Sequence, residues 1–162
     1  MKAISIVAGL GLAVALATPA SAQLLTHKDL SMATALTIAT TAAETCKGQG
    51  NRVSVTVVGR NGEAIVLLRG DDASPHTVEN SRRKAYTART FRIPSGEFAE
   101  RVKNNPTMGL VHLSGVIAAQ GALPIKVGDE VIGAIGVSGS PGGDKDEVCA
   151  KAGIDKAADQ LK

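Results

Sequence analysis

Residues 131–139 read VIGAIGVSG, and this stretch decides the fold. It predicts a strand over Val131–Ser138, and Gly128-Asp129 just before it predicts a tight hairpin turn. A short strand, Leu123–Val127, precedes the turn, and its Pro124 favours a place at the edge of a sheet. The C-terminal half therefore contains an antiparallel hairpin.

The glycines of this stretch do not form a nucleotide-binding motif. Gly133, Gly136 and Gly139 are spaced by three and three, so they do not match GxGxxG, and no Gly-Lys-Ser/Thr ending of a P-loop follows. Glycines inside a strand instead indicate close approach of another backbone or a flat ligand. We expect the strand to pass close to a neighbouring helix or to such a ligand.

A second hairpin is predicted upstream. Apolar residues alternate along the strand that begins at Val53, Gly59-Arg60-Asn61-Gly62 is a turn, and a second strand runs over Glu63–Arg69. The stretch Leu110–Ala119 has no decisive period, and we favour a strand at its end, Val116–Ala119. The connections imply an antiparallel sheet of about five strands.

Four helices accompany these strands. Thr26 is a candidate N-cap for the first helix, which Gly48 stops, and the long breaker-free stretch from His76 predicts the second, which ends before Pro94. A short helix opens at Ser95, and the last helix covers Asp144–Leu161. The sequence thus predicts an α/β (α+β) fold with N- and C-terminal helices flanking the sheet.

The first residues are typical of an export signal. A basic Lys2 precedes an apolar stretch, Ile4–Ala17, and Ala20-Ser21-Ala22 provides the small residues of a cleavage site. We expect residues 1–22 to be a signal peptide and residues 23–162 a single periplasmic or secreted domain. A retained membrane anchor is the weaker interpretation, because the apolar stretch is shorter than the roughly 20 residues that span a bilayer.

Composition argues against nucleic-acid binding. The chain has a formal net charge of only +3, no Trp, two Phe and one Tyr. Proteins that bind nucleic acids use strongly basic surfaces and aromatic side chains on which bases stack. We therefore expect no nucleic-acid partner.

Several separate segments resemble one known family. They are residues 57–62 (VVGRNG) leading to Arg69, 83–88 (RKAYTA), 123–125 (LPI), 131–139 and the downstream Asp146. In this order they are similar to the GlcG/HbpS family, whose domain also forms the C-terminal part of PduO. The resemblance implies a profilin-like domain that often forms homo-oligomers and that in several relatives binds haem or sits beside corrinoid chemistry. It implies no settled catalytic activity.

The chain departs from the family pattern in two places, of which the second resembles exported members. The family's double glycine before Leu-Pro-Ile is Gly121-Ala122 here. The stretch Ser74–Thr77 and the two cysteines resemble features of exported members. Ligand residues of cytoplasmic relatives therefore do not transfer directly to this chain.

Cys46 and Cys149 have two interpretations. Export places them in an oxidising compartment, which favours a disulfide, and they meet if the two terminal helices lie antiparallel on one face of the sheet. The alternative is a thiolate ligand for haem or a metal, although the chain has no CxxC spacing to favour it.

Three histidines are candidate ligands of haem iron. His27 lies near the mature N-terminus, where a histidine is usually solvated, and His112 lies in an apolar run, where a core position is more common. His76 opens the basic helix and is the favoured metal ligand. Tyr86, the single tyrosine, is the alternative, since phenolate serves as ligand in some haem proteins.

The same helix presents a basic face. Arg82, Tyr86 and Arg89 recur at i, i+4 and i+7, with Arg83 beside them. Arginine gives two parallel hydrogen bonds to carboxylates and phosphates, so this face could hold haem propionates, although a simple solvated face explains it equally well. Ser138 and Gly139 begin a second candidate anion site, the loop before the last helix, whose role Asp144 and Asp146 partly fill.

These observations lead to one expected function and two alternatives. We expect a periplasmic or secreted haem-binding protein for haem sequestration or sensing, with cofactor contacts at His76, Arg82, Arg83, Tyr86, Arg89, Ser138 and Gly139. The alternatives are a binding module or enzyme for organic acids or corrinoid-related molecules, and an oligomeric structural protein without cofactor. Ser74, His76 and the nearby aspartates lack the arrangement of a catalytic triad, so no catalytic residue is assigned.

Overall fold

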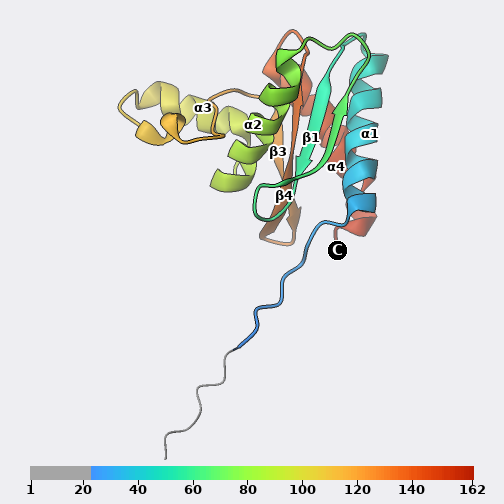
Figure 1. The fold of residues 1–162 in the computed structure, drawn as a ribbon, viewed down its shortest axis with the longest axis vertical. Helices are drawn as coiled ribbons and strands as arrows, with labels where there is room; N and C mark the ends of the chain where they lie inside the picture. Colours follow the sequence, from blue (N-terminus) through green and yellow to red (C-terminus); the bar gives the residue numbers. More distant parts are fainter. Residues whose placement is uncertain (1–22) are drawn as a thin grey trace, which may run out of the picture.

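The computed structural model describes residues 23–162. The predicted signal peptide, residues 1–22, lies outside the described residues. The regular elements, shown in Figure 1, are α1 (Met32–Gly48), β1 (Ser54–Val58), β2 (Ala64–Arg69), α2 (His76–Phe91), α3 (Ser95–Asn104), β3 (Ala122–Val127), β4 (Glu130–Ser138) and α4 (Gly143–Lys156), with 3-10 turns η1 (Gly109–His112) and η2 (Ala158–Gln160). Within residues 23–162, no helix is both long and apolar enough to cross a membrane.

The sheet has the strand order β2-β1-β4-β3, and all neighbours are antiparallel. The glycine-containing stretch 131–139 forms most of β4, which pairs with both β1 and β3. Helices α1 and α4 cover one face of the sheet, α2 covers the other, and α3 reaches away from the sheet beyond α2 (Figure 1). The predicted α/β class with an antiparallel sheet is confirmed.

The fifth strand, predicted at Val116–Ala119, does not form. The described residues contain a sheet of four strands, and this segment is extended without a strand partner, after the 3-10 turn η1. Its backbone bonds to side chains of α2 instead: the Ile117 amide donates to Thr87 Oγ1 at 2.9 Å, and Arg83 Nη2 donates to the Val116 carbonyl at 2.6 Å. These bonds satisfy polar groups that a strand would pair in a ladder.

Two helix boundaries also differ from the prediction. The first helix is capped by Ser31, whose Oγ accepts from the Thr34 amide at 3.1 Å, and not by Thr26, which precedes it without regular structure. The last helix begins at Gly143 and ends at Lys156, so Leu161 lies beyond it. The bounds of α2 and α3 agree closely with the prediction.

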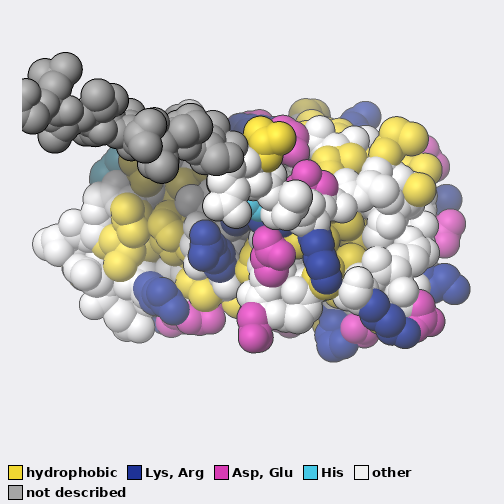
Figure 2. Space-filling model, turned by 90° about the horizontal axis from the view of Figure 1, so that it is seen from below, with side chains coloured by type: hydrophobic (Ala, Val, Ile, Leu, Met, Phe, Trp, Pro, Cys, Tyr) yellow, Lys and Arg dark blue, Asp and Glu magenta, His cyan; other side chains and the backbone are white. Residues whose placement is uncertain are grey.

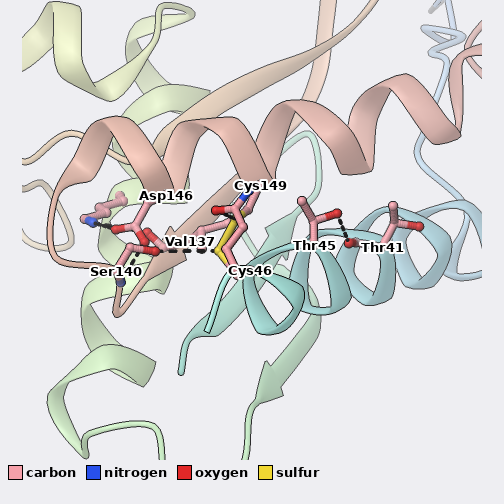
Figure 3. The surroundings of a disulfide bond; sticks show 9 residues. Thr41, Thr45, Cys46, Val137, Ser140, Asp146 and Cys149 are labelled. Carbon is pink, nitrogen blue, oxygen red and sulfur yellow. Dashed lines mark hydrogen bonds and ion pairs between the residues drawn. A yellow bond between two sulfur atoms is a disulfide. The ribbon is translucent and has the colours of Figure 1, made fainter. Parts of the chain in front are cut away.

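The α1–α4 face holds the main apolar core. Ile38 of α1 packs with Val55 and Val57 of β1 and Ile135 of β4. Figure 3 shows Cys46 near the end of α1 bonded to Cys149 in the first turns of α4, with a Cα–Cα distance of 5.6 Å. The predicted disulfide is thus confirmed, and neither sulfur is available as a thiolate ligand.

The α2 face is packed differently. A Cβ added at Gly136 would lie 2.2 Å from the Ser81 carbonyl oxygen, so the backbone of α2 lies directly on β4. This confirms close approach to a helix as the role of that glycine. Two buried hydroxyl pairs also join α2 to β1, Ser54 with Thr77 and Thr56 with Ser81, each at 2.8 Å.

Candidate functional site on helix α2

Helix α2 buries one face and exposes the other. Its buried residues, among them Ser81, Ala85 and Ala88, face β1 and β4. The partly or fully exposed residues include all five candidates that the sequence placed on this helix, namely His76, Arg82, Arg83, Tyr86 and Arg89. The sheet therefore holds α2 by one face and leaves the candidate ligands accessible.

An open hollow of about 350 Å³ lies at the N-terminal half of α2, lined by His76, Glu79, Asn80 and Arg83. These residues share one helical face because they are spaced at three and four. The imidazole of His76 is exposed, and Arg83 uses one N–H on the Val116 carbonyl. The remaining donors of Arg83 are available to an anionic group.

Ser138 reaches this hollow only indirectly. Its side chain is buried, and its Oγ accepts a hydrogen bond from Asn80 Nδ2 at 2.9 Å. The contact connects the end of β4 to the floor of the hollow. Ser138 therefore positions Asn80 and does not itself face the solvent.

Arg82 is already paired within α2. Its Nε and Nη2 donate to the two carboxylate oxygens of Glu79 at 2.9 and 2.8 Å. This bond lowers the pKa of Glu79 and raises the pKa of Arg82. An anionic ligand would have to displace Glu79 to use the guanidinium of Arg82.

Tyr86 is held between two turns. A Cβ at Gly62, in the β1–β2 turn, would lie 2.8 Å from the tyrosine ring, and one at Gly115 would lie 3.1 Å from it. Both glycines have a positive φ, a backbone conformation that residues with a side chain rarely adopt. The ring thus ties the middle of α2 to two separate loops.

Arg89 lies in the last turn of α2. Burial lowers its pKa most, and the charges of Arg92 and Arg60 lower it further. Thirteen residues separate it from His76, which corresponds to about 20 Å along a helix. His76 and Arg89 therefore lie at opposite ends of α2.

The loop that begins with Ser138 and Gly139 is a poor anion site in this structure. The Ser140 amide donates to Asp146 Oδ1 at 3.0 Å, so the chain's own carboxylate occupies that donor, as the sequence indicated. A Cβ at Gly139 would lie 2.3 Å from the Arg52 carbonyl oxygen, which accounts for the glycine by packing.

The two other histidines are both exposed. This agrees with the solvated position expected of His27. It contradicts the core position favoured for His112, which lies in η1 on the surface, because the apolar run around it forms a 3-10 turn and no strand.

Sequence reasoning missed a buried ion pair between α2 and α4. Lys84 Nζ lies 2.9 Å from Asp146 Oδ2 and 3.1 Å from the Val137 carbonyl oxygen, and the two side chains are only 5% and 3% exposed. Lys84 lies in the buried stripe of α2, seven residues after Thr77 and four before Ala88. A lysine on an inward face needs a buried partner, and this signal could have found the pair.

Comparisons with known sequences agree on one family. The family described as "Haem degrading protein HbpS-like" matches residues 30–155. Protein GlcG of Escherichia coli strain K12 is 34% identical over 86 residues, which cover 53% of this chain and 63% of GlcG. An uncharacterized 15.0 kDa protein of the dhaT-dhaS intergenic region of Citrobacter freundii is 30% identical over 106 residues, 64% of this chain and 74% of its own length.

Solved structures show the same relationship. A double mutant of HbpS from Streptomyces reticuli superposes with a TM-score of 0.78 at 36% identity, covering 86% of this chain and 96% of that one. A PduOC:heme complex superposes with a TM-score of 0.72 at 26% identity, and the match covers 78% of this chain and 94% of that one. As its resemblance to GlcG/HbpS predicted, the chain belongs to the HbpS-like family.

Proposed function

We propose that the protein binds haem on the exposed face of α2, with His76 as the axial ligand of the iron. The observation that carries the proposal is the open hollow beside His76 in a chain of the HbpS-like family. The PduOC:heme complex supports it as a structural relative that holds this cofactor. Bound haem would supply the iron chemistry, and the protein supplies the ligands around it.

The residues of the hollow fit such a group. An exposed imidazole is a common ligand of haem iron, and His76 presents one at the edge of the hollow. The free N–H groups of Arg83 can bind a propionate carboxylate. Glu79 would repel a propionate, but its pairing with Arg82 offsets that charge.

The proposal extends to location and assembly. We propose that the signal peptide directs the protein to the periplasm or the exterior, where it sequesters or senses haem. The Cys46–Cys149 disulfide supports this location, because such bonds persist in oxidising compartments. We also propose a homo-oligomer, in which a second copy covers the open side of the hollow.

A hemin titration of the purified protein tests the haem site. We expect a saturable shift of the Soret band, at least about tenfold weaker binding in His76→Ala, and no change in His112→Ala, an exposed histidine outside α2. A loss in Tyr86→Phe with unchanged His76→Ala would assign the ligand to the tyrosine. A shift no larger than that of an unrelated control protein would end the haem proposal.

The location is tested separately. We expect the protein in the periplasmic or culture fraction, with a mature N-terminus at Gln23. A full-length chain in the cytoplasmic fraction would contradict the export proposal without touching the haem site.

A further inference from the structure

Arg89 differs from its neighbours on α2 in its hydrogen bonds. Arg82 donates to Glu79 and Arg83 donates to the Val116 carbonyl. The Nε of Arg89 is buried and has no acceptor among residues 23–162. A buried N–H donor without an acceptor has lost its hydrogen bond to water and gained none in return, so we expect a bound ligand to supply an acceptor for this atom.

The surroundings of Arg89 are unusually positive. Arg60, in the β1–β2 turn, and Arg92, just beyond α2, both lower its pKa through their charges. Arg60 itself is paired with two acids, since its Nη2 lies 2.8 Å from Glu130 Oε1 and its Nε lies 3.2 Å from Asp29 Oδ1. Glu63 acts on Arg89 only through its charge, while its Oε2 accepts from the Asn61 amide at 3.0 Å.

Helix polarity does not provide the missing acceptor. The dipole of α2 favours a cation in the last turn, but no backbone carbonyl accepts a hydrogen bond from Arg89 in the described part of the chain. Figure 2 looks onto the underside of the fold as drawn in Figure 1, where α2 and the β1–β2 turn end, and basic and acidic side chains alternate across it. Arg89 takes part in none of the ion pairs of residues 23–162, whereas Arg60, Arg82 and Arg101 each pair with an acid.

We infer that Arg89 anchors a binding site for a carboxylate or phosphate group at the C-terminal end of α2, with Arg92 supplying further positive charge beside it. A planar guanidinium binds such an oxyanion through its Nε–H and one Nη–H in parallel. The site lies about 20 Å along α2 from His76, so it goes beyond the proposed haem contact.

Calorimetric titration with inorganic phosphate and with succinate, in low-chloride buffer, tests the site in the purified protein. We expect saturable binding that weakens roughly 10- to 100-fold in Arg89→Gln and less in Arg89→Lys, which keeps the charge but loses the fork. Glu63→Gln should strengthen binding, because it removes a negative charge that acts on Arg89. Arg101→Gln, which alters an arginine paired with Glu97 on α3, is the matched control and should have no effect.

Hemin titrations of the same variants identify the source of the oxyanion. Unchanged hemin affinity in Arg89→Gln would mean that the site takes a free carboxylate or phosphate. A parallel loss of hemin affinity, with competition by phosphate, would mean that it takes a propionate of a haem that is not ligated by His76. Absence of saturable phosphate and succinate binding, or equal binding in Arg89→Gln and the wild type, would overturn the inference whatever hemin does.

Discussion

On the α1–α4 side of the sheet, the contacts come from apolar side chains such as Ile38 and Ile135 and from the Cys46–Cys149 bond. On the α2 side they come from small residues and two hydroxyl pairs, and one buried ion pair joins α2 to α4 of the other side. Apolar packing is non-directional and scales with buried area, whereas hydrogen bonds and ion pairs need defined geometry. The first side therefore supplies most of the stability, and the second sets the position of the helix that carries the candidate site.

The largest effect is expected on the apolar side, from removal of the disulfide. The bond joins residues 103 apart, and loss of so long a loop constraint costs about 4 to 5 kcal/mol in the chain-entropy model. Urea unfolding of Cys46→Ala with Cys149→Ala should show this loss, while hemin binding by the folded fraction stays unchanged. A loss below about 1 kcal/mol would mean that apolar packing alone holds α1 to α4.

The buried ion pair should give the next largest effect, on the other side. Lys84→Met leaves the Asp146 carboxylate buried without its cation, which typically costs about 3 to 5 kcal/mol. Combining it with Asp146→Leu should recover most of the loss in urea unfolding. If the single variant is as stable as the wild type, the pair does not fix α2 as we describe.

The third largest effect is expected at Gly136, where the backbone of α2 lies against β4. Gly136→Ala places a methyl group against the backbone of α2, and overpacking of this kind costs about 1 to 3 kcal/mol. Because α2 must move, hemin affinity should fall together with the unfolding midpoint. Gly109→Ala is the control, since its Cβ would meet nothing within 4 Å and should change neither measurement.

A smaller effect is expected from one hydroxyl pair. Thr56→Val removes the partner of Ser81 across the β1–α2 contact and should cost about 1 kcal/mol. Adding Ser81→Ala to Thr56→Val should lower the free energy of unfolding by little more. A double-mutant cycle measures this non-additivity as coupling between the two positions. Strictly additive losses would mean that the hydroxyls do not act as a pair.

The exposed ion pair of α2 should have the smallest effect. Arg82 lowers the pKa of Glu79 from its ordinary value near 4.5, so the pair stabilises the fold above that pH and loses this contribution as pH falls through the lowered value. Both side chains are largely exposed, so Glu79→Gln should cost only a few tenths of a kcal/mol at pH 7 and nothing at pH 2. If Glu79→Gln and the wild type differ in stability by the same amount at pH 7 and pH 2, the ionised Glu79–Arg82 pair is not the cause.

The two sides also differ in how far the sequence predicts them. The hairpins, the four helices and the apolar stripes follow from turn residues and period, and the predicted export signal led to the prediction of the disulfide. The segment Val116–Ala119 was misassigned because its partners are side chains of α2, which no local pattern identifies. Lys84 and Asp146 are 62 residues apart in the sequence. Only the inward position of the lysine on its helix indicates that it needs a buried partner.

The candidate site was predicted in composition but not in geometry. Helical spacing correctly put Arg82, Tyr86 and Arg89 on one face. It could not show that Glu79 occupies Arg82 or that Ser138 faces Asn80, because both depend on side-chain directions. The predicted bounds of α2 already placed His76 and Arg89 at opposite ends of the helix, and the structure agrees.

The packing of Tyr86 between Gly62 and Gly115 has a practical consequence. The chain has one tyrosine and no tryptophan, so its ultraviolet emission originates from this one ring, where α2 meets two loops. The protein thus carries an intrinsic optical reporter beside its candidate site. Quenching of this emission by hemin, or its response to phosphate, would follow each ligand without any attached label.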